Sequence, residues 1–169
     1  MFTLRCTQRL LARSKVRLAT EPVEPTTRLG DWYANLLHLG RLQLVLAVSE
    51  RTFLPVLIPA APISTLVPRL RDGLGEVLRA LDVANAEIER EIGEMEDVAY
   101  GKTANRQVTG IMVDFAKALE LYIEREAPLL ALALALAQTP CSPFYETEEI
   151  SPDRKTVAMF ARPDVRLVR

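Results

Sequence analysis

The chain has 169 residues, of which 49% are hydrophobic and 25% charged, and its formal net charge is −1. A chain of this length and composition buries roughly 70% of its unfolded surface, so we expect a single domain, residues 1–169, with one core. The balanced charge excludes a strongly basic nucleic-acid coat protein. Cys6 and Cys141 lie far apart without a CxxC spacing, which excludes a disulfide framework and a zinc site and favours a reducing cytoplasm.

The first twenty residues are basic and contain no acid. An Arg-rich, acid-free start is typical of a mitochondrial transit peptide. Apolar and polar residues alternate over residues 2–7, however, which predicts a half-buried strand, and a short helix over residues 7–15 then accounts for the basic side chains. We therefore favour a strand followed by a helix over a targeting segment, and no apolar region of a secretory signal precedes the charges.

Turn residues divide the next part of the chain. Residues 19–30 contain prolines and a glycine and predict a loop. Asp31 is a natural N-cap and Gly40 a natural helix stop, which predicts a two-turn helix between them. Two β-rich runs then predict a hairpin over residues 42–58. Pro55 cannot donate to a ladder, so the second strand of this hairpin is expected at an edge or a bulge.

Helical periodicity dominates the middle of the chain. It predicts helices at residues 65–81, from Asn85 onward, and at residues 105–126, with a short strand at 98–100. The run at 129–137 contains only leucine and alanine. Because alanine favours helices, this run predicts a helix that is apolar all round, buried at the centre of the domain and too short to cross a membrane.

The C-terminal part predicts further strands at residues 144–145 and 156–160, then a basic tail over residues 161–169. Strands at both ends with helices between them, and no regular βαβ alternation, predict an α+β domain. We expect a small antiparallel sheet, made of the N-terminal strand, the hairpin 42–58 and a C-terminal strand, packed against a bundle of about four to five helices.

The sequence Tyr-Gly-Lys-Thr-Ala-Asn-Arg at residues 100–106 is a candidate site. Its Gly-Lys-Thr resembles part of a P-loop, but that motif needs a glycine where this chain has Glu96. What remains is a basic helix start with an asparagine cap, and helix N-termini bind anions through free N–H groups. Alternatively, the basic side chains form ordinary salt bridges with the acidic helix 87–97. The candidate ligand-binding residues here are Lys102, Thr103, Asn105 and Arg106.

A second candidate segment places the only tryptophan beside arginine, aspartate and tyrosine. Arginine and aromatic residues are enriched in interface anchors and stacking pockets. The alternative is that the tryptophan is an ordinary core residue. The candidate residues of this segment are Arg28, Asp31, Trp32 and Tyr33.

The usual catalytic and metal-binding motifs are missing from the sequence. His38 is the only histidine, which excludes HExxH and three-histidine metal sites. No nucleophile elbow, dinucleotide-binding glycine pattern or EF-hand loop occurs. The acidic residues between 87 and 97 are typical of a solvated helix face. We therefore expect no metal and no cofactor.

Several segments together resemble a family of small bacterial proteins that carry a domain of unknown function. They are the opening Phe-Thr-Leu-Arg-Cys-Thr and residues 26–37, 48–52 and 101–114. The resemblance covers residues 2–160. The family's version of the long-helix start is Asn-Arg-Ser-Val-Leu-Gly, whereas this chain has Asn-Arg-Gln-Val-Thr-Gly at 105–110, so hydroxyl chemistry at the lost serine is not expected. The resemblance implies a cytoplasmic bacterial protein and supplies no reaction.

Three hypotheses about function follow. The first is a non-enzymatic binding or interaction protein with an unknown protein partner and a polar site at residues 28–33 and 102–106, because no catalytic constellation is complete. The second is a binder or enzyme that acts on a phosphorylated ligand, nucleotide or nucleic acid through residues 102–106. The third is one component of a two-gene bacterial system such as a toxin and antitoxin, suggested only by the small size and bacterial character of the chain. No membrane partner is expected.

Overall fold

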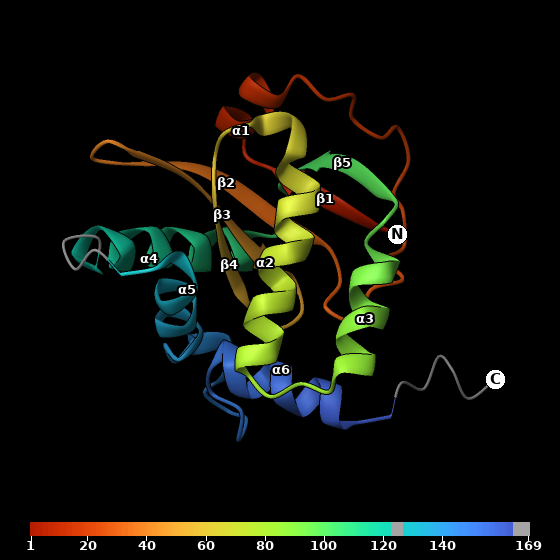
Figure 1. The fold of residues 1–169 in the computed structure, drawn as a ribbon, viewed down its shortest axis with the longest axis vertical. Helices are drawn as coiled ribbons and strands as arrows, with labels where there is room; N and C mark the ends of the chain where they lie inside the picture. The colour runs from red at the N-terminus through yellow and green to blue at the C-terminus, as the bar shows by residue number, and fades with distance from the viewer. Residues whose placement is uncertain (123–126, 164–169) are drawn as a thin grey trace.

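A computed structural model describes residues 1–122 and 127–163 and shows an α+β domain, as the sequence predicts (Figure 1). At its centre lies a five-stranded sheet with the strand order β4-β3-β2-β1-β5. The strands are β1 (Phe2–Cys6), β2 (Trp32–Leu39), β3 (Leu42–Ser49), β4 (Pro55–Pro59) and β5 (Val98–Lys102).

The predicted antiparallel sheet is wrong in its strand arrangement, because the sheet is mixed. β1 pairs in parallel with both β2 and β5, whereas β2 with β3 and β3 with β4 are antiparallel. The chain reaches β5 from β4 through α2 (Leu66–Ala80) and α3 (Asn85–Glu94), and a crossover of this kind brings a strand in parallel. The strand beside β1 on its outer side is therefore β5 and not a C-terminal strand.

Residues 32–39, predicted as a helix, form the interior strand β2. Trp32 and Tyr33 point to opposite faces of the sheet, and both are buried. A strand that is buried on both faces shows no alternation of polar and apolar residues, so its period gives no strand signal. Gly40 does not stop a helix; its φ of +61° makes the tight turn between β2 and β3.

Helices cover the two faces of the sheet. The strand register places Trp32 and Val56 on one face and Tyr33 on the other. α2 packs on the first face, where a Cβ on Gly73 would lie only 2.9 Å from Cγ1 of Val56, so the glycine allows close approach. α4 (Arg106–Tyr122) packs over β2 and β3 and begins beside Tyr33. We call these faces the α2 face and the α4 face.

Most helix predictions of the N-terminal and middle parts are confirmed. α1 (Gln8–Ser14) follows β1, and α2 and α3 lie within their predicted ranges, α2 after a short 3-10 turn at Ile63–Thr65. The strand predicted at 98–100 is confirmed as β5, which continues to Lys102. The predicted end of the long helix, residues 123–126, lies outside the described residues.

The hairpin of β3 and β4 is confirmed, and β4 is the edge strand that Pro55 suggests. The backbone N–H of Ser49 donates to the carbonyl of Leu54, and that of Ala60 donates to Gln43, so these hydrogen bonds lie at the two ends of the ladder between β3 and β4. Successive residues of a strand point their peptide groups alternately toward and away from the neighbouring strand, so those of residues 55, 57 and 59 point away from β3. Two of these three are prolines, so the outer edge of β4 keeps one N–H donor. Prolines placed in this way protect an edge strand from pairing with another strand.

The leucine and alanine run forms α5 (Leu129–Ala137), as predicted, but the helix does not lie at the centre of the domain. It packs against the edge strand β4, and Ala131 and Ala135 are exposed. The apolar composition predicts burial on all sides, whereas the structure leaves one side of α5 uncovered.

The C-terminal part is helical where strands are predicted. Residues 156–160 lie in α6 (Pro152–Ala161). The apparent turn Ser151-Pro152-Asp153 is the start of this helix, with serine at the N-cap, proline in the first turn and an acid after it. Phe144, also predicted as strand, ends a 3-10 turn at Ser142–Phe144 and stacks on Phe53 with ring centroids 4.8 Å apart. Of the predicted tail, residues 164–169 lie outside the described residues.

Candidate functional site

The loop before β2 is anchored to α3 by one buried carboxylate. Glu91 is 2% exposed, and its two oxygens accept the backbone N–H groups of Arg28 at 2.7 Å and of Leu29 at 3.0 Å. A carboxylate that binds two adjacent amides fixes the path of the backbone. The loop therefore delivers residues 28–33 to the sheet in one conformation.

Arg28 is part of this anchor rather than of an open site. Its guanidinium pairs with Glu87 at 3.2 Å and donates to the carbonyl oxygens of Met159 and of Arg162. It also lies 5.1 Å from the ring centroid of Phe160. These partners belong to α3 and to the end of α6, so Arg28 ties these two helices together. The structure does not place it with the start of α4.

Trp32 is a core residue. Its side chain is fully buried on the α2 face, between Leu4 of β1 and Ser49 of β3 in the register of the sheet. Its indole N–H finds no hydrogen-bond partner among the described residues. A buried indole of this kind contributes apolar area and is not positioned to stack on a ligand.

Tyr33 joins the two candidate segments, which lie about seventy positions apart along the chain. Its hydroxyl oxygen accepts the backbone N–H of Asn105 at 3.2 Å and donates to Oε1 of Glu50 at 3.3 Å. Burial and the Glu50 carboxylate raise the pKa of Tyr33, and Arg5 opposes this shift. The hydroxyl is therefore neutral at physiological pH and acts as a structural link between the sheet and α4.

Asp31 holds the side chain of Arg5. One oxygen of the buried carboxylate accepts a hydrogen bond from the Nε–H of Arg5 at 2.9 Å, and the other accepts one from the backbone N–H of Thr3 at 2.9 Å. Arg5 lies beside Gly101 of β5, where a Cβ would be in ordinary contact with Nη1 of Arg5 at 3.6 Å and closer, at 3.1 Å, to Cγ2 of Thr3. The Arg5 side chain remains 24% exposed.

This geometry leaves the far end of the guanidinium available. Among the described residues, Arg5 makes hydrogen bonds only through Nε, so its two terminal nitrogens have no protein acceptor. An arginine whose orientation is fixed by a buried carboxylate presents a rigid fork of donors, which matches the geometry of a carboxylate or phosphate.

The start of α4 is capped by its own asparagine. Oδ1 of Asn105 accepts the backbone N–H of Gln107 at 2.9 Å and of Val108 at 3.4 Å. Two of the amides that would bind an anion at this helix end are thus already occupied. The helix end alone is therefore a weaker anion site than the sequence suggests.

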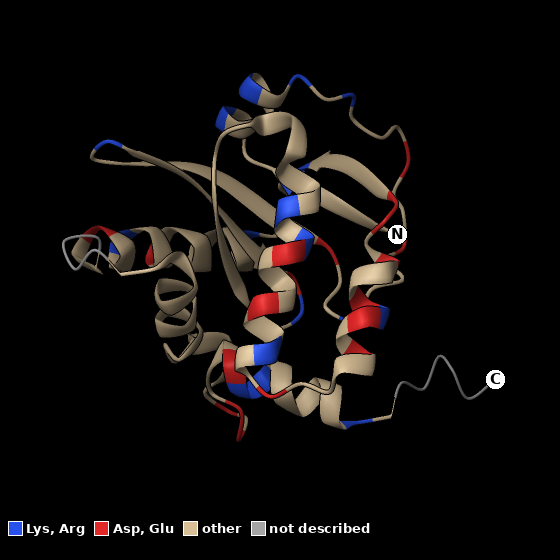
Figure 2. Ribbon diagram, in the orientation of Figure 1, with Lys and Arg blue, Asp and Glu red and all other residues tan. Residues whose placement is uncertain are grey.

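Lys102 and Arg106 are both exposed, and neither pairs with the acidic helix. The acidic residues along α3 (Figure 2) and those that follow it pair instead with Arg28, Arg90, Arg71 and the N-terminal amino group. Strand alternation places Lys102 on the α2 face with Cys6, whereas Arg5 and Tyr33 lie on the α4 face. Thr103, which follows β5, is half-buried.

A family model matches residues 3–155 of the chain; it describes a domain of unknown function, DUF6933. The chain belongs to the DUF6933 family. This confirms the resemblance to a family of that kind. No curated protein and no solved structure matches the chain.

In this DUF6933 chain the sequence prediction missed Arg5 and Glu50. Arg5 belongs to the polar half of the alternation in β1, and that pattern is the signal that places it on a sheet face. Glu50 lies in the turn after β3 and gives no signal of its own, because its contact with Tyr33 depends on the register of β2 and β3.

The described residues of the DUF6933 chain contain neither a metal-binding cluster nor a membrane-spanning helix. Among residues 1–122 and 127–163, no three His, Cys, Asp or Glu side chains lie close enough to hold a metal ion. None of the helices in these ranges is both long and apolar enough to cross a membrane.

Proposed function

We propose that this DUF6933 chain is a non-enzymatic binding protein of the bacterial cytoplasm whose ligand places an anionic group beside Arg5. The site lies on the α4 face, between the end of β1 and the start of α4. The observation that carries the proposal is the orientation of Arg5, which a buried carboxylate holds through Nε while both terminal nitrogens keep no acceptor among the described residues. The two cysteines are free and buried, which is consistent with a reducing compartment.

The neighbours of Arg5 favour binding over catalysis. Tyr33 is neutral because its pKa is raised, and its hydroxyl is already engaged by Asn105 and Glu50. Asp31 is engaged by Arg5 and by the backbone of Thr3. Glu50 already accepts the Tyr33 hydroxyl through Oε1, so an oriented cation is the chemistry that we propose for this cluster.

The second candidate function is binding of a phosphorylated ligand, nucleotide or nucleic acid through residues 102–106. It is favoured by the exposure of Lys102 and Arg106, which form no ion pair with the acidic helix. The net charge of −1 disfavours a nucleic acid as the ligand.

Calorimetric titration with inorganic pyrophosphate and with citrate tests the site and separates the two anion chemistries. We expect Arg5→Lys, which keeps the charge but loses the fork, to weaken binding by roughly ten- to a hundredfold, the value of one charge-assisted hydrogen bond. Arg106→Ala removes an exposed charge and should weaken binding by roughly two- to fivefold. Lys102→Ala should have no effect if the anion lies on the α4 face.

Arg79→Ala is the matched control, because Arg79 is an exposed arginine on α2, the helix that packs on the opposite face. Equal affinity in Arg5→Lys and Arg79→Ala would refute the proposed site. Weakened binding in Lys102→Ala but not in Arg5→Lys would move the anion to the second candidate, the phosphate site at residues 102–106.

A further inference from the structure

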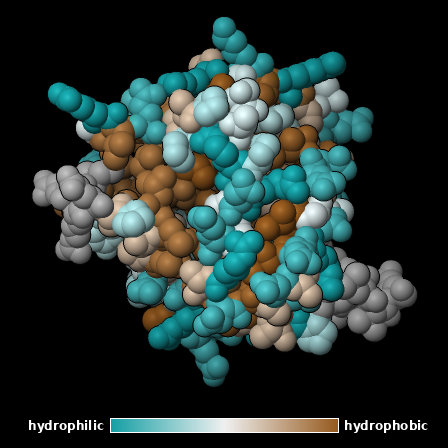
Figure 3. Space-filling view, viewed as in Figure 1, coloured by the Kyte–Doolittle hydropathy of each residue, from teal (hydrophilic) through white to brown (hydrophobic). Residues whose placement is uncertain are grey.

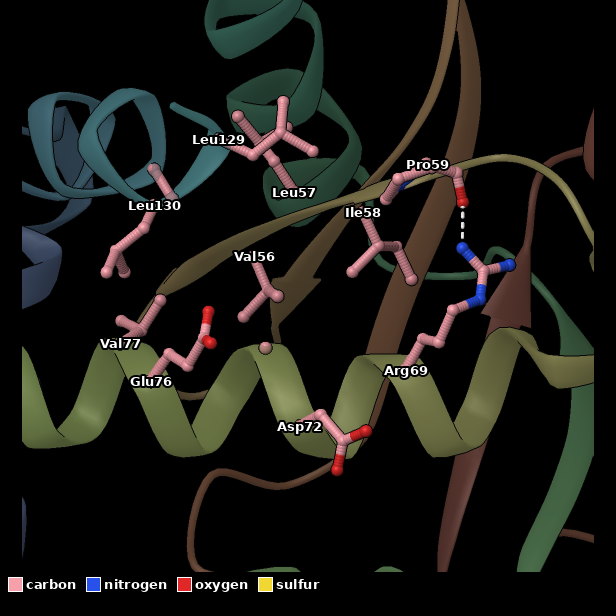
Figure 4. Close-up of a pocket in the computed structure, with 12 residues that line it drawn as sticks. Val56, Leu57, Ile58, Pro59, Arg69, Asp72, Glu76, Val77, Leu129 and Leu130 are labelled. Carbon is pink, nitrogen blue, oxygen red and sulfur yellow. Dashed lines mark hydrogen bonds between the residues drawn. The ribbon is translucent and has the colours of Figure 1, made fainter. Parts of the chain in front are cut away.

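A groove of about 230 Å³ lies between α2, the edge strand β4 and α5 (Figure 4). Val56 and Ile58 point from β4 toward α2, and Leu130 of α5 also lines the groove. Figure 4 also shows the Glu76 carboxylate pointing from α2 toward the groove, and Glu76 forms no ion pair with the described residues. The groove is smaller than the roughly 300–1,000 Å³ of small-molecule sites, so it suits side chains rather than a cofactor.

The apolar surface continues from the groove over α5. Apolar residues gather over this part of the molecule in Figure 3. α5 has no polar side chain, its Leu130 and Leu134 are half-buried, and its Ala131 and Ala135 are exposed. A helix on the surface of a soluble monomer carries polar residues on its outer side. The apolar outer side of α5 is thus typical of a surface that a protein partner covers.

The edge strand restricts how a partner binds here. Because Pro55 and Pro59 remove outward N–H donors from β4, an added strand would find one donor in three outward positions. The partner is therefore expected to present side chains from a helix instead of pairing its backbone with β4.

The chain itself carries a helix face of the required chemistry. Val113 and Leu121 of α4 are 52% and 76% exposed, and Leu121 is the most exposed large hydrophobic side chain in the described residues. Lys117 lies between them and is also exposed. These three residues follow one another at four-residue intervals, so they share one side of the helix. We call them the α4 stripe.

We propose that a second copy of this chain docks its α4 stripe in the groove between α2, β4 and α5. The leucine and valine of the stripe then cover the apolar groove and the adjoining leucines of α5, and Lys117 lies beside the unpaired Glu76. The stripe and the groove are different surfaces, so two copies either exchange stripes as a reciprocal pair or associate head to tail. This contact is independent of the proposed anion site.

Sedimentation equilibrium over a range of protein concentrations, combined with a charge swap, tests the contact. We expect wild type to associate. Glu76→Lys and Lys117→Glu should each raise the dissociation constant about tenfold, because each replaces an attraction with a repulsion. The double variant that carries both substitutions restores the pair with reversed charges and should return to within about threefold of wild type.

Leu121→Gln tests the apolar part without affecting the fold, because the side chain is mostly exposed in the monomer. Loss of a leucine buried in the contact should weaken association by roughly ten- to a hundredfold. Glu89→Lys is the charge-matched control, since Glu89 is exposed on α3, and it should associate as wild type does. A wild type that stays monomeric at all concentrations, association unchanged by Leu121→Gln, or a double variant no better than the single ones would each overturn the proposal.

Discussion

Removing the charge of Glu91 tests how the loop that leads into β2 is held. In Glu91→Gln the side chain keeps its size, but only one oxygen remains to accept two backbone N–H groups, those of Arg28 and Leu29. The new amide NH₂ group faces the second N–H, so one buried donor loses its acceptor. A buried donor without a partner costs about 1–3 kcal/mol. We therefore expect the free energy of unfolding to fall by about 2 kcal/mol.

Urea denaturation monitored by tryptophan fluorescence measures this change, because Trp32 is the only tryptophan and is fully buried. In a chain of this size, 2 kcal/mol corresponds to a decrease in Tm of roughly 4–8 °C. Glu89→Gln on the exposed side of the same helix is the control and should stay within about 0.5 kcal/mol of wild type. If Glu91→Gln is no less stable than this control, the carboxylate does not hold the loop and our account of the anchor is wrong.

Further predictions concern stability and pH. Arg106→Ala should raise the free energy of unfolding by about 0.5 kcal/mol, because an unpaired cation at a helix start opposes the helix dipole; a decrease in thermal stability would show that Arg106 has a structural partner. Tyr33→Phe loses the link to Asn105 and Glu50 and should cost about 1–2 kcal/mol in a urea titration; no change would refute that link. Burial raises the pKa of Cys6 from 9.0 to about 12. Between these two values the folded state keeps the thiol proton and the unfolded chain has lost it. The stability that the protonated Cys6 thiol contributes is therefore fully present below about pH 9. As the pH rises toward 12, the free energy of unfolding falls by about 1.4 kcal/mol per pH unit. Cys6→Ala should flatten the decline in stability measured between pH 9 and 11, and an unchanged slope would contradict the burial of the thiol.

The sequence predicts elements well where one local pattern acts alone. The helices α2 and α4 have apolar residues at helical spacing on one side, and in the structure both form helices that bury these residues. β2 fails because it is an interior strand with both faces buried, so a residue pattern such as Trp-Tyr-Ala-Asn-Leu-Leu has no period of two. The strand prediction for residues 156–160 is wrong for a different reason. Their β-branched and aromatic residues favour a strand, but Ser151 and Pro152 begin a helix that continues through them.

The candidate site was predictable only in part. Both segments that contain Tyr33 and Asn105 stand out in the sequence, but their hydrogen bond depends on α4 packing over β2, which no local pattern encodes. The alternation along β5 would have separated Lys102 from Tyr33 had the strand register been known. The ion pairs of the acidic segment likewise depend on tertiary placement, which brings Arg28 to Glu87 of α3 and Arg71 to Glu96 just after it. The same placement leaves Arg106 exposed.

Native mass spectrometry of protein purified gently from its own host shows whether Arg5, held by Asp31, binds an anion. We expect a bound adduct that carries a carboxylate or phosphate group and is lost in Arg5→Lys but retained in Arg79→Ala. The ratio of absorbance at 260 and 280 nm identifies a nucleotide among such adducts. A protein that carries no adduct and gains no stability from pyrophosphate or citrate would contradict the claim, and a second protein bound in its place would make the chain an interaction module without an anion site.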